Sequence, residues 1–436
     1  MIDSSVKSLF AAWDRRLLSI FLFGFSSGLP FLLTLSTLTI WLKESGLTNA
    51  TIGLFVAVTI PYTLKFLWGP MVDLIKIPVL SNFLGQRRSW ALLAQGLLVI
   101  MLLGLGRSNP AEHIFETALW ALGVSFWSAI QDIVVEAYRI EIIDENQKGF
   151  AASSTYLGWR LGTMMSGAGA LYLAAIFSWS AAYELMALLM GIGILTTLLS
   201  PSPKASSVKQ YHPHASQGLW TVPRIWEWIR SLYGTPLKAL LKTADFRIVL
   251  LFILFYKIGD TSLSVMNTPF LLEIGFTKLE IAHVVKLFGI SATIFGAFAG
   301  GIFLNRFGLL AGLMFCTVLQ IVSSLMFVIQ ALIGYDLSVL FLTIGVENFT
   351  SGLGAAAFIA YLSSLCRAPY TATHYALLTS FGSFARILLS AGAGFLADIL
   401  PWPTFFACTT VACLPCLFLL IQASRHFSPL SFLKQS

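Results

Sequence analysis

The chain has 436 residues, of which 57% are hydrophobic and 11% are charged, and its mean hydropathy is +0.82. Soluble domains carry roughly 25% charged residues, so this composition excludes an ordinary soluble protein and indicates a membrane protein with many spans. The net charge of +7 must then be explained by where Lys and Arg lie along the chain.

Apolar stretches long enough to cross a bilayer, about 20 residues each, recur from residue 17 to residue 423. We predict twelve membrane-spanning helices, at 17–40, 51–72, 89–107, 114–138, 150–176, 179–200, 247–272, 278–304, 308–334, 337–365, 372–398 and 402–423. Backbone groups in lipid must be hydrogen-bonded internally, and the runs are too long and continuous for barrel strands. The predicted fold class is therefore an all-α polytopic membrane protein.

The distribution of Lys and Arg predicts the orientation, because cytoplasmic loops are enriched in these residues. With the N-terminus inside, 19 of the 27 Lys and Arg residues fall in cytoplasmic segments and 3 fall in outer loops. We therefore expect both termini in the cytoplasm. The positive charge then reflects topology and attraction to the inner leaflet, and we expect no nucleic-acid partner. The N-terminal stretch has no small-residue cleavage site, so we expect no signal peptide.

One extended polar region interrupts the series of spans. Residues 201–246 begin with PSPKASSVKQYHPHASQG and continue with a mixture of Trp, Ile, Arg and Lys. The second part is typical of a basic amphipathic helix at the membrane surface. We predict an N-terminal six-helix half at 1–200, a cytoplasmic linker at 201–246 and a C-terminal six-helix half at 247–436.

The two halves resemble each other. SGAGALYLA at 166–174 recurs as SAGAGFLA at 390–397, an offset of 224 residues. GPMVD, which begins at Gly69, corresponds to GIFLNRFG, which begins at Gly301. A repeat of six helices places a substrate path between the two halves, although Gly-rich strings also serve ordinary close packing of helices.

Polar residues interrupt the fourth span in the stretch QDIVVEAYRIE. Asp132 and Glu136 are four residues apart and share one helix face, with Gln131 beside them. A carboxylate that alternates between a dry and a wet environment can take up and release a proton. We expect Asp132 or Glu136 to carry the coupling proton, with Asp132 as the stronger candidate and with Arg139 and Arg160 as the counter-ions.

Further charges lie within the predicted spans, where each must face partners or water. Asp260 and Glu347 complete the predicted proton-coupling set. The predicted substrate-binding set consists of Gln131, Arg160, Tyr256, Lys257, Lys286, Asn348, Tyr361 and Arg386. Five cations against four carboxylates in the spans favour an anionic substrate.

Simpler roles stay open for these residues. Any one of the charges could be a structural ion pair, and Lys65 could extend to the nearby membrane surface. Aromatic side chains such as Tyr62 and Trp127 could stack on sugar rings, although aromatic residues also occur at ordinary membrane interfaces.

GPMVD and the two arginines that follow it predict a gate on the cytoplasmic side. Gly69 permits close approach of another helix. Asp73 can pair with a basic residue when this side closes, and Arg87 and Arg88 are the nearby candidates.

Several strings together resemble one family. They are GFSSGLPFLLTLSTL, KFLWGPMVD, GQRRSW, QDIVVEAY, YLGWRLG, FYKIGD, ENFTSGLGAAAFIAYLSSLC and ATHYALL, which extend along nearly the whole chain. On these strings the chain is similar to the AmpG muropeptide permeases of the major facilitator superfamily (MFS). The resemblance implies the MFS fold, twelve helices in two six-helix halves. It also implies uptake of N-acetylglucosaminyl-1,6-anhydro-N-acetylmuramyl peptides from periplasm to cytosol by proton symport across the bacterial inner membrane, for peptidoglycan recycling.

Two positions depart from the family pattern. Glu136 stands where the family usually has Asp, and Asn305 stands where MFS halves often have Asp. The related acetyl-CoA transporters share the Gln-Asp pair of the fourth span and also carry an anion. A transporter of another anionic cargo is therefore the alternative function.

An enzyme is not expected. Every loop except 201–246 is short, and that loop has only Glu227 and Asp245 as acids, without a metal-type cluster. The Cys pair at 413–416 lies in an apolar helix and is best explained by packing. We expect no cofactor and no metal. The expected partners are an anionic glycopeptide, protons and the lipid bilayer, and we expect a monomer.

Overall fold

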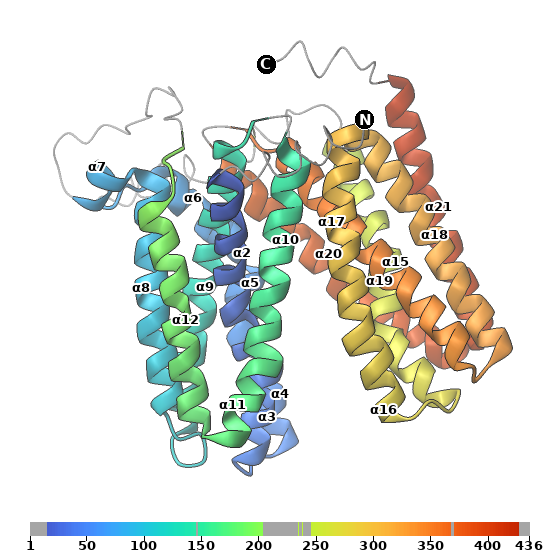
Figure 1. The fold of residues 1–436 in the computed structure, drawn as a ribbon, viewed down its shortest axis with the longest axis horizontal. Coiled ribbons are helices and arrows are strands. Elements are labelled where there is room, and N and C mark those ends of the chain that lie inside the picture. The colour runs from blue at the N-terminus through green and yellow to red at the C-terminus, as the bar shows by residue number, and fades with distance from the viewer. Residues whose placement is uncertain are drawn as a thin grey trace, which may run out of the picture. The chain divides into compact units, whose positions relative to one another are not determined.

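The computed structural model describes residues 15–144, 147–203, 234, 238, 246–367 and 370–426, and every regular element in these ranges is helical (Figure 1). The all-α prediction is therefore confirmed for the described residues. Most of the predicted linker, 201–246, with its amphipathic segment, lies outside them.

The chain divides into two compact units. Unit 1 comprises Met1–Glu145, Ser154–Lys242 and Leu362–Ser380, and unit 2 comprises Asn146–Ser153, Thr243–Tyr361 and Phe381–Ser436. The short segments 146–153 and 362–380 thus belong to the unit built mainly by the other part of the chain. They occupy corresponding places in the two repeats predicted from the sequence.

Most predicted spans coincide with long helices. Nine helices in the described part are long and apolar enough to cross a membrane, and they match all predicted spans except 51–72, 150–176 and 372–398. These three stretches are also helical, but they are interrupted or less apolar. The number twelve therefore stays a prediction.

Unit 1 is built around four long helices. They are α2 (Arg15–Leu33), α8 (Gln86–Arg107), α9 (Ile114–Ile142) and α12 (Trp179–Leu199). In this group α8 packs on both α9 and α12, and α2 packs on α9 and α12 (Figure 1). Buried apolar side chains such as Leu33, Leu98, Val124 and Met190 fill the space between them. Burial of such side chains is worth about 1.5–3 kcal/mol each in water, whereas in lipid close packing must supply the stability.

Small residues bring α2 into close contact with α10 (Lys148–Met164). A Cβ atom added at Gly24 or Gly28 would collide with the backbone of α10, and one added at Gly158 or Gly162 would collide with the backbone of α2. Each helix therefore presents a G-x-x-x-G pair to the other, a sequence pattern that allows helices in membranes to approach closely. After this contact α10 continues through the π-helical turn Met165–Gly169 into α11 (Ala170–Ile176).

The second predicted span is broken into short pieces. It consists of α4 (Asn49–Phe55), the 3-10 turn Val56–Thr59, α5 (Ile60–Thr63) and α6 (Lys65–Leu74). Pro61 occupies the first turn of α5, where its missing N–H and fixed φ suit a helix start rather than a helix interior. The break leaves Lys65 at the first residue of α6.

The first span is also interrupted, because α3 (Ser36–Glu44) follows α2 after a turn at residues 34–35. The remaining short helix of unit 1, α7 (Leu80–Leu84), precedes α8. The α8 helix begins after Gly85, whose φ of 78° suits a residue without a side chain.

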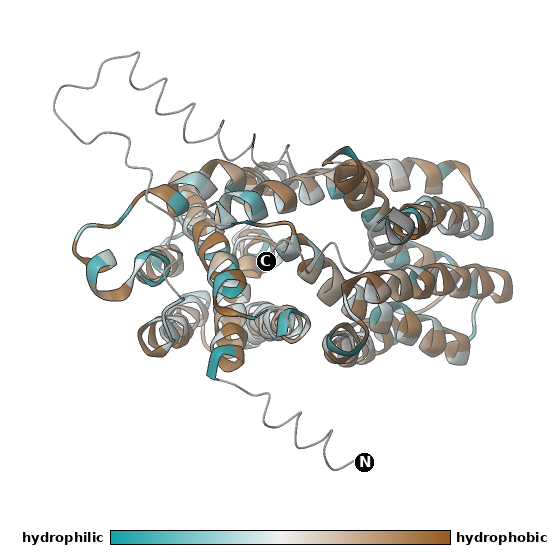
Figure 2. Ribbon diagram, turned by 90° about the horizontal axis from the view of Figure 1, so that it is seen from above, coloured by the Kyte–Doolittle hydropathy of each residue, from teal (hydrophilic) through white to brown (hydrophobic). Residues whose placement is uncertain are grey.

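Unit 2 contains most of the second half of the sequence. Its elements are α15 (Phe246–Glu273), α16 (Lys278–Ile281), the π-helical Ala282–Phe288, α17 (Gly289–Phe307), α18 (Leu309–Ile333), α19 (Leu337–Ser364), most of α20 (Thr371–Ile399) and α21 (Trp402–His426). The α18 and α21 helices pack together, and α21 also packs on α15. Figure 2 shows these helices mainly in the brown of hydrophobic residues. Large apolar side chains such as Leu332 and Phe418 are exposed, as expected for surfaces that face lipid.

Candidate functional site

Asp132 and Lys65 form an ion pair inside unit 1. Lys65 Nζ on α6 lies 3.6 Å from Asp132 Oδ2 on α9, and the two side chains are 17% and 19% exposed. A separation of 3.6 Å is too long for a hydrogen bond, so the pair is held by charge alone. Lys65 therefore pairs with an acid of α9 and does not simply extend to the membrane surface, which is the simpler role that its sequence position leaves open. Asp132 pairs with Lys65 and not with Arg160.

Polar side chains from three helices surround this pair. Ser27 on α2 lies beside Asp132, and Ser128 on α9 lies beside the Tyr62 hydroxyl on α5. The side-chain polar atoms of Ser27, Tyr62, Ser128 and Gln131 are buried and have no hydrogen-bond partner among the described residues. We call these four residues, with Lys65 and Asp132, the Asp132 cluster.

Unpartnered polar atoms in such number are informative. A buried polar atom without a partner costs about 1–3 kcal/mol, and most such atoms in proteins have partners. Ser128 and Asp132 lie four residues apart on α9, with Gln131 between them, so these side chains project from neighbouring positions of one helix. The Asp132 cluster therefore has free donors and acceptors around a pair of opposite charges, which is what recognition of a polar ligand or of water requires.

Arg160 lies on α10 among aromatic rings. Its Nε donates a hydrogen bond of 2.9 Å to the Tyr156 hydroxyl, and its guanidinium lies 5.2 Å from the Tyr156 ring centroid and 5.7 Å from that of Trp159. Phe31 on α2 contacts both Trp159, at 5.5 Å, and Tyr62, at 5.7 Å between ring centroids. A row of aromatic rings thus connects the Arg160 guanidinium with the Asp132 cluster.

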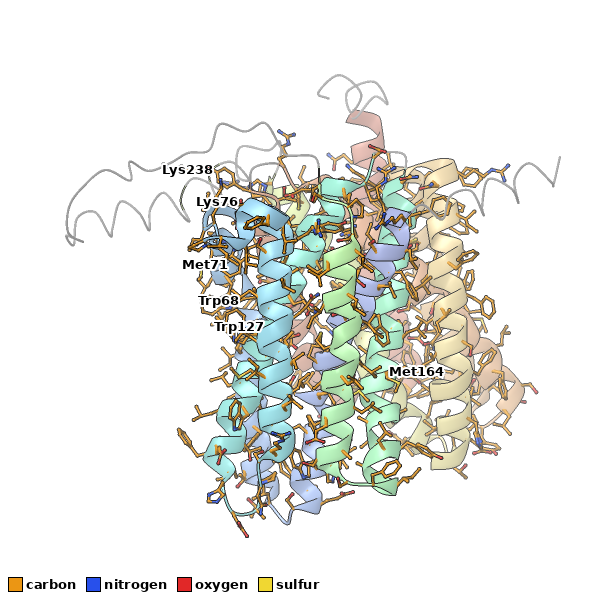
Figure 3. All side chains as sticks on the ribbon, turned by 60° about the vertical axis from the view of Figure 1, so that its left-hand side comes forward. Trp68, Met71, Lys76, Trp127, Met164 and Lys238 are labelled. Atoms are coloured by element: carbon orange, nitrogen blue, oxygen red, sulfur yellow. The ribbon has the colours of Figure 1, made fainter. Side chains whose placement is uncertain are left out.

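Trp127 belongs to another aromatic group. Figure 3 labels it near Trp68, and the Phe126 ring lies 4.9 Å from the Trp68 ring and 5.2 Å from the Trp127 ring. Of the two side chains predicted to stack on sugars in this half, only Tyr62 therefore contacts the row of rings next to the Asp132 cluster.

Glu136 pairs with Arg139 one turn along α9. Arg139 Nε donates to Glu136 Oε2 at 2.9 Å, and the Arg139 side chain is only 2% exposed. The guanidinium also donates to Ser363 Oγ at 2.8 Å and lies 5.8 Å from the Tyr375 ring centroid. Glu136 and Arg139 therefore connect α9 with the segment 362–380 of the same unit. The pairing expected for Arg139 is present.

Asp73 lies at the start of α20. Its carboxylate accepts hydrogen bonds from the Thr373 N–H at 2.8 Å, the Thr373 hydroxyl at 2.6 Å and the Ala372 N–H at 3.3 Å. A carboxylate is favourable there because the first N–H groups of a helix have no partners within the helix and the helix dipole is positive at this end.

Arg87 joins this carboxylate to a second one. It lies 2.7 Å from Asp73 Oδ1 and 2.6 Å from Glu141 Oε1, and the Asp73 side chain is fully buried. We call Asp73, Arg87, Glu141 and Thr373 the Asp73 lock. Sequence reasoning found Asp73 and Arg87 but missed Glu141 and Thr373, because neither residue lies near them in the chain.

Gly69 lies one turn before Asp73 and gives the lock its close fit. A Cβ atom there would lie 2.9 Å from Thr373 Cα and 3.3 Å from Ala376 Cβ. In unit 2, Gly301 makes the corresponding contact, because its added Cβ would lie 2.5 Å from Ser153 Oγ near the start of α10. The repeat predicted from GPMVD and GIFLNRFG therefore corresponds to two similar helix contacts.

Arg88 has a different place from its neighbour. It donates to the carbonyl oxygens of Thr197 at 2.8 Å and Leu198 at 2.6 Å, and to Ser202 Oγ at 3.1 Å. It therefore bonds the last carbonyl groups of α12, whereas Arg87 joins the carboxylates of the lock.

Five of the residues predicted in unit 2 form two groups, one around Tyr256, Lys257 and Tyr361 and one around Glu347 and Asn348. Tyr256 stacks on Phe358 at 5.1 Å and donates to the Gly354 carbonyl at 2.9 Å, and Lys257 Nζ lies 4.7 Å from the Phe358 ring centroid. Tyr361 joins this aromatic group through Phe252, at 4.7 Å.

The second group joins α17 with α19. Asn348 Nδ2 lies 2.6 Å from Glu347 Oε2, and its Oδ1 accepts a hydrogen bond of 3.0 Å from the Thr293 hydroxyl. Arg386 on α20 is exposed. The side chains of Asp260 and Lys286 lie outside the described residues.

Comparisons with known proteins agree with this architecture. A relative from Rickettsia felis named "Putative transporter AmpG 4" is 33% identical over 414 residues, which cover 94% of this chain and 97% of the relative. The family model described as acetyl-coenzyme A transporter 1 matches residues 16–123.

Two solved structures share the fold. The human organic anion transporter MFSD10 aligns with a TM-score of 0.67 at 17% identity, covering 93% of this chain and 99% of that one. The major facilitator superfamily proton:xylose symporter XylE aligns with a TM-score of 0.63 at 11% identity, covering 94% of each chain.

The helical architecture and these likenesses define a membrane transporter with the major facilitator fold, and not an enzyme. The identity with the Rickettsia relative extends over almost the whole of both chains. The chain belongs to the AmpG family of transporters.

Proposed function

We propose that this protein imports anhydro-muropeptides, the N-acetylglucosaminyl-1,6-anhydro-N-acetylmuramyl peptides of peptidoglycan recycling, from periplasm to cytosol. Uptake is driven by protons across the bacterial inner membrane, with both termini in the cytoplasm. The observation that carries the proposal is the Asp132 cluster, a carboxylate and a cation within membrane-spanning helices and next to unpartnered polar atoms.

Asp132 is the proton carrier in this proposal. Its only partner at ion-pair distance among the described residues is Lys65, and the partial exposure of both side chains lets water reach them. Glu136 is less suited to this role because it is tied to the almost fully buried Arg139. We assign Glu136 to holding the segment 362–380 against α9.

The neighbouring aromatic row suits a glycopeptide. The flat faces of Trp159 and Phe31 can contact sugar rings, and Arg160 and Lys65 supply positive charges for the carboxylates of the peptide. In unit 2 the Tyr256, Phe358 and Tyr361 group with Lys257 offers a similar combination.

The Asp73 lock is the cytoplasmic gate of the proposed cycle. When it is closed, Asp73 satisfies the first N–H groups of α20, and when the substrate leaves for the cytosol these bonds break. Arg87 keeps Glu141 as a partner throughout, so the opening separates α20 from α6 without leaving a lone buried cation.

Acetyl-coenzyme A is the second candidate cargo. The match of residues 16–123 to the acetyl-coenzyme A transporter model favours it, and this range contains Tyr62 and Lys65. Both cargoes are anionic, so the charges of the site do not distinguish between them.

Uptake by proteoliposomes tests the choice. The purified protein is reconstituted, and accumulation of radiolabelled anhydro-muropeptide and of acetyl-coenzyme A is measured with and without an inwardly directed proton gradient. We expect gradient-dependent accumulation of the muropeptide only. Accumulation of acetyl-coenzyme A alone would establish the second candidate, and accumulation that ignores the gradient would refute proton coupling.

A further inference from the structure

The Lys65–Asp132 pair is built unlike the other buried ion pairs of unit 1. Arg87 lies 2.6 Å and 2.7 Å from its two carboxylates and hydrogen-bonds both, whereas Lys65 lies 3.6 Å from Asp132 without a hydrogen bond. The Lys65 side chain is 17% exposed, whereas the side chains of the other two cations, Arg87 and Arg139, are 9% and 2% exposed. A loose and accessible pair can exchange partners at a lower cost than a hydrogen-bonded one.

We propose that Lys65 binds a carboxylate of the cargo. Until Asp132 takes up a proton, its own carboxylate pairs with Lys65 and takes the place of the cargo carboxylate. The inference rests on the proposed function and adds to it the exchange of partners at Lys65 that couples one proton to each carboxylate bound there. In the empty site Asp132 is the anion beside Lys65, and in the loaded site the cargo carboxylate takes that place.

Charge balance in a water-poor site supports this exchange. Two carboxylates beside a single ammonium group would leave one uncompensated negative charge among buried residues, which is strongly unfavourable. A proton on Asp132 removes that charge, so the site is neutral both when it is empty and when it is loaded. Each carboxylate that binds Lys65 therefore requires one proton.

The other groups around Asp132 do not replace the proton. The facing groups are Lys65 from α6, the neutral hydroxyl of Tyr62 from α5, Ser27 from α2, and Glu136 from α9 itself. Glu136 adds a negative charge, which Arg139 compensates. Lys65 is thus the cation that both carboxylates must share.

The unpartnered polar atoms complete the recognition of the cargo. The amide of Gln131 has neither donor nor acceptor bonds among the described residues, and the hydroxyls of Tyr62 and Ser128 also lack partners. A carboxylate or peptide amide beside Lys65 would supply the acceptors and donors that these atoms lack. The cluster therefore fits the acidic end of a peptide better than it fits a neutral sugar.

The proton and charge balance of the cycle is complete. On the periplasmic side the Asp132 carboxylate takes a proton from water, and Lys65 remains an ammonium group and binds the cargo carboxylate. On the cytoplasmic side the cargo leaves, Asp132 returns its proton to water, and its carboxylate pairs again with Lys65. One proton enters with each carboxylate bound at Lys65.

Binding to purified protein in nanodiscs tests the proposal. The probes are the anhydro-muropeptide with a tripeptide stem, the same molecule with its carboxyl groups amidated, and acetyl-coenzyme A. The variants are Lys65→Gln, Lys65→Arg, Asp132→Asn and the double variant Lys65→Gln/Asp132→Asn. Lys76→Gln, which removes the same charge from an exposed position outside the cluster (Figure 3), is the matched control.

We expect Lys65→Gln to weaken binding of the acidic muropeptide by roughly tenfold or more and to leave binding of the amidated probe within about twofold. Lys76→Gln should bind like wild type, and Lys65→Arg, which keeps the positive charge, should bind the acidic probe more tightly than Lys65→Gln does. Between the Asp132 pKa of the empty site and that of the loaded site, the wild-type affinity should fall by up to about tenfold per unit of rising pH, because a proton must enter with the carboxylate. The Asp132→Asn variant should bind the acidic muropeptide tightly, and its affinity should not change with pH in this way.

Two results would overturn the inference. They are equal affinity of Lys65→Gln and wild type for the acidic probe, or an unchanged pH slope in Asp132→Asn. If Lys65→Gln does not fold, the double variant, which leaves no lone carboxylate, gives the same comparison. Lys65-dependent binding of acetyl-coenzyme A, which carries phosphates and no carboxylate, with no binding of either muropeptide, would refute both the proposed cargo and the carboxylate as the group that Lys65 binds. Failure of wild type to bind any probe would refute both.

Discussion

Neutralising Asp73 is expected to free the start of α20 while leaving the protein folded. The carboxylate accepts bonds from Arg87, Thr373 and Ala372 and is fully buried. In Asp73→Asn the side chain retains one carbonyl oxygen, which can still accept the hydrogen bond from the Thr373 N–H. The amide nitrogen that replaces the other oxygen faces donors, so it cannot accept from either Arg87 or Ala372.

The size of the effect follows from these contacts. Removing one partner of a buried charge pair costs about 3–5 kcal/mol. Arg87 retains its bonds to Glu141, so the lower end, about 3 kcal/mol, applies. Because about 1.4 kcal/mol corresponds to a factor of ten, the open form of the lock should gain roughly a hundredfold in population.

Thiol labelling measures this population. The five native cysteines are replaced, and a single cysteine is placed at Ala372, whose side chain is fully buried and packs near Val72. A water-soluble maleimide then reacts only when the lock opens. The labelling rate in membranes should rise by roughly a hundredfold in Asp73→Asn, in proportion to the open population, until the open form dominates.

Asp398→Asn is the matched control. It removes the same charge near the other end of α20, where the side chain is exposed, and should leave the rate unchanged. A rate in Asp73→Asn within about twofold of the parent would refute the assignment of Asp73 as the group that holds α20 closed. A rise of equal size in Asp398→Asn would show that labelling reports helix charge and not the lock.

Three further predictions follow from the contacts. Arg87→Gln leaves two carboxylates without their cation and should reduce the yield of folded protein, measured by size-exclusion chromatography, with recovery when both acids are neutralised. Gly158→Ala pushes a methyl group into the backbone of α2 and should destabilise the protein by about 1–3 kcal/mol or more, whereas Gly191→Ala, which meets no atom within 4 Å, should be neutral in thermal unfolding. The hydrogen bond from Tyr335 is the largest cause of the lowered pKa of Glu280. This contribution to stability is present above the unfolded-state pKa and is lost as the pH falls through the folded-state value. Tyr335→Phe should therefore raise the Glu280 pKa, reduce this contribution and complete its loss at a higher pH, as NMR titration of the carboxyl would show.

Much of the architecture could be predicted from the sequence because hydropathy alone marks helices that face lipid. The uninterrupted spans, such as 89–107 and 308–334, coincide with α8 and α18. The broken second span was less predictable, since Pro61 reads equally as a kink inside a helix or as the start of a new one. The structure shows a new helix, α5, and a second helix, α6, begins directly after it with Lys65 as its first residue.

The site could be predicted only where its partners are close in sequence. Glu136 and Arg139 are three residues apart, and their pairing follows from helical spacing. Lys65 and Asp132 lie on different helices, so no local pattern joins them, and the position of Lys65 near a span end suggested contact with the membrane surface instead. Glu141 and Thr373 were missed for the same reason, because tertiary packing brings them to Asp73.

The most direct test of the central claim compares accumulation with exchange in Asp132→Asn. Proteoliposomes carrying wild type or the variant are tested for uphill accumulation of labelled anhydro-muropeptide under a proton gradient, and for exchange of labelled against unlabelled muropeptide without one. If Asp132 carries the coupling proton, the variant exchanges substrate but does not concentrate it, because exchange needs no net proton movement. Accumulation by the variant against a substrate gradient, with wild-type dependence on pH, would contradict the account.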